Sequence, residues 1–123
     1  MNNNKSISIS SRIKSFGFAL EGIITFFRTQ HNAWIHAFAA IIVIISGFVL
    51  KVNNNEWCLI FIAIALVFIA EMANTAIEFL TDIVSPEYNL QAKKVKDVAA
   101  AAVLISAIAA IVIGLIIFLP KLL

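Results

Sequence analysis

This 123-residue chain has few of the residues that build several familiar kinds of site. Its one cysteine, Cys58, lies in an apolar segment and has no partner for an internal disulfide, so we expect a packed or lipid-facing thiol. The four glycines form no G-x-x-x-x-G-K-[ST] loop, and the signature set of protein kinases is also missing. Any use of ATP therefore requires a different kind of site.

Charge is scarce as well. Only 13% of the residues are charged, the net charge is +2, and no basic patch is interleaved with exposed aromatic residues. These features exclude nucleic acid as the expected partner. Hydrophobic residues instead make up 62% of the chain, against about 45–50% in soluble domains. Because the excess falls into blocks, the sequence predicts an all-α membrane protein with a single domain.

Three apolar blocks are each long enough to cross a bilayer, which takes about 20 residues. We predict transmembrane helices at about residues 34–52, 57–84 and 98–119. The short linker 51–56 predicts that the first two are antiparallel neighbours. The linker 85–97 is longer and charged, with Lys96 and Asp97 opening the third span, and we expect Pro120 to end that span.

The segment before the first span has a different pattern. Between residues 12 and 28, apolar side chains recur at helical spacing among polar ones, which predicts an amphipathic helix on the membrane surface. Packing of this helix against the bundle is the alternative. We expect residues 1–11 to be disordered or frayed and residues 12–123 to form the membrane domain. The first apolar block starts too far along the chain, near Trp34, to predict a signal peptide.

Basic residues predict the orientation. Two of them, Lys51 and Lys121, belong to one side of the predicted membrane. Seven belong to the other side, in the N-terminal segment and the second linker: Lys5, Arg12, Lys14, Arg28, Lys93, Lys94 and Lys96. The excess of positive charge predicts a cytoplasmic N-terminus and second linker, and a C-terminus outside.

One polar stripe stands out inside the apolar blocks. Glu71, Asn74, Glu78 and Asp82 follow one another at i, i+3, i+7 and i+11, so they share one face of the second predicted span. Acidic groups at the edge of a membrane span are costly, and by default they mark a functional site. Two alternatives stay open, a structural network with the linker lysines and a solvated helix-end charge for Asp82.

The residue types in the stripe suit a divalent cation and a proton transfer. Mg²⁺ prefers oxygen ligands, and Glu78 is a candidate ligand for it. Glu71 lies deepest, where desolvation favours the protonated carboxyl and so suits a general base. Lys96 could neutralise phosphate oxygens, while Asp97 could orient Lys96 or cap the third helix. We interpret Lys93 and Lys94 as an interfacial basic patch and His36 as a packed or interfacial histidine.

The segment Glu71–Asp82, EMANTAIEFLTD, resembles the signature E-x-x-N-[ST]-A-I-E-x-x-x-D of the prokaryotic diacylglycerol kinases and undecaprenol kinases. These are small integral membrane lipid kinases. The similarity extends over about residues 12–119 and includes residues 17–22, residues 32–36 and the Lys96–Asp97 pair. It implies a homotrimer in the bacterial inner membrane, with three transmembrane helices per subunit. It also implies transfer of the ATP γ-phosphate to a lipid hydroxyl, with Mg²⁺ as cofactor.

The resemblance also implies individual roles. It makes Glu71 the catalytic base supported by Asn74, and Glu78 a metal ligand. The implied nucleotide-binding residues are Lys96, Asp97, Glu78 and Phe18, and the implied lipid-side or supporting residues are Asp82, Asn32 and Glu71. Where the family often has a second metal-binding glutamate, this chain has Gln30. We therefore expect weaker metal binding, or a substitute carboxylate from Glu21.

Several alternatives remain at this stage. The acceptor could be undecaprenol or diacylglycerol, and residues 32–36 look closer to the undecaprenol kinase branch. On physical grounds alone, intramembrane acids would also suit a small transporter or an ion-conducting oligomer. The exchange at Gln30 also leaves a catalytically silent homologue as an alternative.

Overall fold

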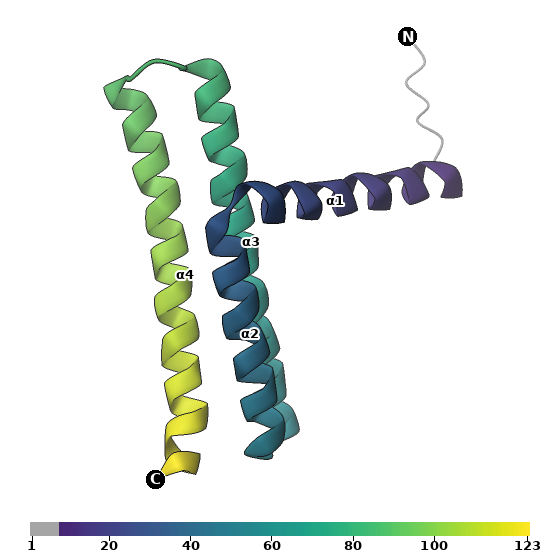
Figure 1. Ribbon diagram of the computed structural model, residues 1–123, viewed down its shortest axis with the longest axis vertical. Coiled ribbons are helices and arrows are strands. Elements are labelled where there is room, and N and C mark those ends of the chain that lie inside the picture. Colours follow the sequence, from purple (N-terminus) through teal and green to yellow (C-terminus); the bar gives the residue numbers. More distant parts are fainter. Residues whose placement is uncertain (1–7) are drawn as a thin grey trace.

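A computed structural model describes residues 8–123, which form four α-helices and no strand. In chain order these are α1 (Ile9–Thr29), α2 (His31–Val49), α3 (Asn54–Val84) and α4 (Leu90–Leu122). Figure 1 shows α2, α3 and α4 running alongside one another, with α1 leaving the bundle crosswise. The predicted all-α fold is confirmed.

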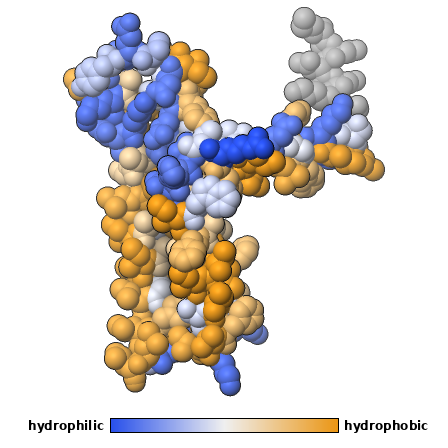
Figure 2. Space-filling view, viewed as in Figure 1, coloured by the Kyte–Doolittle hydropathy of each residue, from blue (hydrophilic) through white to orange (hydrophobic). Residues whose placement is uncertain are grey.

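Three of the helices, α2, α3 and α4, are long and apolar enough to cross a membrane, as the sequence predicted for three helices. Large apolar side chains such as Phe61, Ile105 and Ile116 point outward and are more than half exposed. In Figure 2 the apolar surface covers most of the bundle, and the polar surface gathers at the end where α3 and α4 are joined. A lipid environment explains this outward apolar surface.

The helix starts differ from the predicted ones because polar side chains cap them. Asn53 accepts from the Glu56 N–H while Glu56 bonds back to the Asn53 N–H, so α3 begins before Trp57. The Asn89 side chain caps α4 by accepting from the Gln91 N–H, so residues 90–97 are helical and the linker contains only residues 85–89. The prediction that Asp97 caps this helix is therefore wrong.

Two further predictions about chain ends need correction. The first helix begins at Ile9 with Ser8 as its N-cap, so residues 9–11 are helical, while residues 1–7 lie outside the described part of the chain. Pro120 does not end α4, which continues to Leu122. A proline in the last turn costs the helix one backbone hydrogen bond, and the next turn closes through the Leu123 N–H on the Leu119 carbonyl.

The bundle core lies toward the end opposite the polar one. Val52, Ile60 and Ile117 are buried there against Trp57, and Gly47 lets α2 approach the Trp57 ring closely. Lys121 and Glu56 form an ion pair of 3.1 Å at the same end. The corner between α1 and α2 is held by the Trp34 indole, which donates to the Phe27 carbonyl at 2.8 Å. Because this apolar packing holds α3 and α4 together at one end, the other end, where the two helices are joined, can carry polar side chains.

Candidate active site at the polar end of α3

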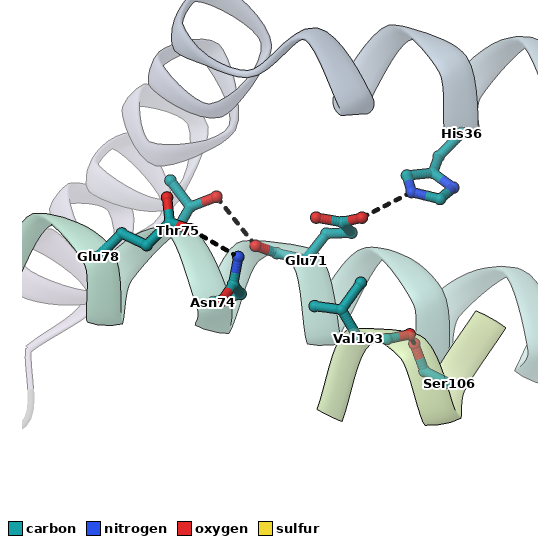
Figure 3. Close-up of polar contacts among 7 residues, drawn as sticks. All are labelled: His36, Glu71, Asn74, Thr75, Glu78, Val103 and Ser106. Carbon is teal, nitrogen blue, oxygen red and sulfur yellow. Dashed lines mark hydrogen bonds and ion pairs between the residues drawn. The ribbon is translucent and has the colours of Figure 1, made fainter. Parts of the chain in front are cut away.

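The predicted polar stripe lies on α3 and follows a gradient of burial. Glu71 is only 5% exposed, Asn74 and Glu78 are half-buried, and Asp82 is exposed. Figure 3 shows Glu71, Asn74 and Glu78 along this stretch, with Ser106 of α4 beside it. The gradient leads from a dry carboxylate to solvent-accessible charges within three helical turns.

The carboxylate of Glu71 is bound by a histidine from α2. The distance between Glu71 Oε1 and His36 Nε2 is 2.7 Å, and both side chains are mostly shielded. An ionised carboxylate has only acceptors, so with Glu71 ionised the His36 proton must be on Nε2. The Thr75 hydroxyl donates to the Glu71 main-chain carbonyl at 2.9 Å, which leaves the carboxylate to His36. The pairing of Glu71 with a linker lysine is therefore not observed.

Asn74 and Glu78 form a second polar pair one turn away. The Asn74 amide donates to Glu78 Oε1 at 3.2 Å, which turns the amide oxygen the other way. That oxygen, Oδ1, is buried and has no hydrogen-bond partner. Leaving a buried acceptor unpaired costs about 1–3 kcal/mol. Such an atom is best explained by a group that this chain does not itself provide.

The basic residues of α4 reach the outer end of the stripe. Lys96 Nζ lies 2.6 Å from Asp82 Oδ1, so the structure brings together two residues that the sequence predicted for the site. Asp97 instead accepts from Lys93 at 2.6 Å, and the predicted Asp97–Lys96 contact is wrong. Both pairs are exposed, and exposed ion pairs contribute little to stability because water and salt screen them. An incoming anion could therefore take Lys96 from Asp82 at little cost.

The remaining predicted site residues lie apart from the stripe. Gln30 is at the α1–α2 corner, where its amide donates to Thr29 Oγ1 at 3.2 Å. Asn32 is exposed, and Phe18 is 68% exposed on α1. Within residues 8–123, no hydrogen bond or ion pair joins any of these three to α3, and no group of three or more His, Cys, Asp or Glu residues could hold a metal ion.

Sequence reasoning took His36 for a packed or interfacial histidine and did not predict its contact with Glu71. The available signal was a lone ionisable residue inside the first apolar block, which by default marks a functional position in a membrane span. What the sequence could not show was the partner, because the pairing of His36 with Glu71 depends on how α2 packs against α3.

Known proteins resemble this chain over most of its length. Residues 17–118 match the family model described as prokaryotic diacylglycerol kinase. An undecaprenol kinase from Bacillus subtilis is 44% identical over 109 residues, which cover 89% of each protein. A diacylglycerol kinase from Synechocystis is 39% identical over 110 residues, which cover 89% of this chain and 63% of that protein.

Proposed function

This chain belongs to the prokaryotic diacylglycerol kinase family, and from that premise we propose how its α3 stripe serves a lipid kinase. The reaction is phosphorylation of the hydroxyl group of a membrane lipid alcohol with ATP as the phosphate donor. The observation that carries the site assignment is the buried Glu71 carboxylate at the head of a stripe that ends on the Lys96–Asp82 pair. Both named relatives are kinases, so the transporter alternative is not favoured.

Helix length supports a site at the membrane interface. A hydrocarbon core about 30 Å thick takes up about 20 helical residues. Counted from Asn54, the core would end near residue 73, whereas α3 continues to Val84. Glu71 would then lie at the last turn inside the core, and Asn74, Glu78 and Asp82 would lie in the headgroup region. This is the depth at which a lipid hydroxyl and a soluble nucleotide can meet.

In the proposed reaction Glu71 is the general base. The lipid hydroxyl oxygen forms a bond to the γ-phosphorus while its proton passes to the Glu71 carboxylate. The bond from the γ-phosphorus to the bridging oxygen breaks, and ADP leaves with that electron pair. The His36 N–H fixes one carboxylate oxygen and leaves the other free to accept the proton. General-base catalysis of this kind typically contributes about 10²–10⁴-fold.

Oxygen ligands for Mg²⁺ are present one turn away. We assign Glu78 as the residue that would hold the ion, and the Asn74 amide supports its carboxylate by donating to Oε1. When bound, Mg²⁺ would supply positive charge for the phosphate oxygens. Gln30 would add only a neutral amide oxygen from the α1–α2 corner.

Lys96 is the proposed phosphate contact. It lies beside the stripe and could exchange Asp82 for a phosphate oxygen, which would place positive charge where negative charge develops. We assign Asp97 and Phe18 to the nucleotide side, and Asp82 and Asn32 to supporting roles near the lipid. These assignments rest on the resemblance to the family.

The setting we propose is the bacterial inner membrane, with the stripe on the cytoplasmic side and the C-terminus outside. The lysine and arginine distribution supports this orientation. Exposed apolar side chains along α1, such as Ile13 and Phe16, support a place for this helix in the headgroup layer. A homotrimer would bring in the side chains that the metal site lacks in one chain.

The test is ATP consumption by the purified protein in mixed micelles. Phosphorylation should require an added lipid alcohol, and the labelled γ-phosphate should appear on that lipid. Undecaprenol and diacylglycerol should be assayed side by side, with a long-chain alkane as the control without a hydroxyl. Failure to phosphorylate either lipid alcohol would reject the proposed function.

A further inference from the structure

A groove lies between α2, α3 and α4 below the candidate site. It has a volume of about 320 Å³, and its lining comes from His36 to Val43 of α2, Ile60 to Phe68 of α3 and Ala107 to Phe118 of α4. At 1.5 Å per helical residue these walls are roughly 10 to 16 Å long. The groove is therefore a narrow trough along the bundle and lies within the predicted membrane depth.

Only one side chain in the groove lining is polar. That residue is His36, at one end, and the others are aliphatic or aromatic. The same His36 holds Glu71 through the 2.7 Å contact. A molecule lying in the groove with its polar end toward His36 would place that end next to the proposed base. His36 therefore lines the groove and also contacts Glu71, the proposed base.

The lining limits what can occupy the groove. A diacylglycerol brings two tails and two ester carbonyls, and this lining offers no donor but His36 for those carbonyls. A polyisoprenoid alcohol brings one tail and a single polar atom, its terminal hydroxyl. Small residues, including Ala40, Ala63, Ala110 and Gly114, leave room along the walls for methyl branches.

We propose that this groove binds the hydroxyl-proximal part of the tail of a polyisoprenoid alcohol and so selects that class of acceptor over diacylglycerol. The proposal rests on the proposed function. The hydroxyl lies at the His36–Glu71 end, the first isoprene units fill the trough, and the rest of a long tail continues into the bilayer.

A bulky side chain in the groove tests the proposal. Ala110→Phe fills the trough, whereas Val112→Phe adds the same ring on nearly the opposite face of α4, where Val112 is 47% exposed and outside the lining. We expect Ala110→Phe to raise the KM for a polyprenol by at least about tenfold, with the KM for ATP unchanged. Val112→Phe should leave both values unchanged. Equal polyprenol KM values in the two variants would overturn the tail site.

Photolabelling gives a second measurement that does not depend on how Ala110→Phe folds. A polyprenol with a diazirine on an early isoprene unit is bound to the wild-type protein, and the labelled peptides are mapped. Labels should fall on groove residues and be displaced by unlabelled polyprenol, but not by equal amounts of diacylglycerol or phospholipid. Labels confined to the outer face around Val112, or displaced equally by all three lipids, would overturn the proposal. If wild-type protein phosphorylates polyprenol in the same preparation, such a failure concerns the groove and leaves the kinase function standing.

Discussion

Glu71 is the residue on which the proposed chemistry depends most directly. Glu71→Gln keeps the size of the side chain and can still accept from His36, so the fold should remain intact, but the amide cannot take up the hydroxyl proton. We expect kcat to fall by about 10²–10⁴-fold with little change in the KM for ATP. Glu87→Gln removes an exposed carboxylate outside the stripe and is the matched control. Near wild-type kcat in Glu71→Gln would reject the base assignment.

His36 is expected to act through Glu71 as a positioning residue. His36→Leu removes the donor and leaves the buried carboxylate free to turn, while His36→Gln keeps an N–H near the same place. Losing such an orienting contact typically costs about 10–100-fold. We expect that loss in kcat for His36→Leu and partial recovery for His36→Gln. The thermal midpoint should also be lower for His36→Leu than for His36→Gln, because His36→Leu leaves the buried Glu71 carboxylate without a donor. A loss confined to thermal stability, with kcat unchanged, would mean that His36 is only structural.

The roles of Lys96 and Asp82 can be separated by single substitutions. Their pair is exposed, so Lys96→Met and Asp82→Asn should each change the free energy of unfolding very little. If Lys96 contacts phosphate, Lys96→Met should raise the KM for ATP far more than Asp82→Asn does. Lys93→Met, which removes the neighbouring exposed lysine, is the control for lost positive charge. Matching effects of Lys93→Met and Lys96→Met would point to general electrostatic attraction only.

At the scale of single residues, the sequence predicts which residues form the stripe. It does not predict which residues of other helices contact them. The spacing of Glu71, Asn74, Glu78 and Asp82 defines one helix face whatever the tertiary structure. The contacts of Lys96 with Asp82 and of His36 with Glu71 join residues 14 and 35 positions apart. Such pairings depend on the packing of separate helices, which no local pattern contains.

At the scale of the helices, the apolar blocks and the apolar periodicity of residues 12–28 predict where each helix lies, and the capping residues determine where it begins. The predicted third span began at residue 98 because charged residues precede it, yet Asn89 starts that helix eight residues earlier. The charges on residues 93–97 are compatible with a helix because they lie beyond the expected hydrocarbon depth. Charged side chains are excluded from the hydrocarbon core, so they limit the length of the transmembrane span. The helix itself can continue through them outside the hydrocarbon core.

The close approach of α2 and α3 gives a prediction for helix packing. A Cβ at Gly47 would lie 2.5 Å from the Trp57 ring, whereas one at Gly17 on α1 would meet nothing within 4 Å. Gly47→Leu should therefore destabilise the bundle by about 1–3 kcal/mol through overpacking. Gly17→Leu should be neutral or slightly stabilising, because leucine favours helix more than glycine does. The measurement is the thermal midpoint in detergent, and equal midpoints would show that Trp57 swings aside freely.

In the whole molecule, the boundary between the polar and the apolar surface lies near the level of α1 along the bundle. Figure 1 shows α1 leaving the bundle below the α3–α4 connection, and Figure 2 shows most of the polar surface at and above that level. A bilayer that begins beneath α1 would cover the apolar column as far as Glu71. The outer part of the stripe from Asn74 to Asp82, Lys96 and the connection would lie in the headgroup region or in water. The shape of the molecule therefore agrees with a kinase that meets its lipid at the interface.

The charge distribution then predicts which end faces the cytoplasm. In a Cys58→Ala background, a single cysteine at Glu87 marks the α3–α4 connection and one at Leu123 marks the opposite end, and both positions are exposed. A maleimide that cannot cross the inner membrane should label the Leu123→Cys protein in intact spheroplasts. It should label the Glu87→Cys protein only after lysis, because positive charge holds that end inside. The reverse pattern would place the α3 stripe away from cytoplasmic ATP, and it would contradict the orientation even if the purified protein were an active kinase.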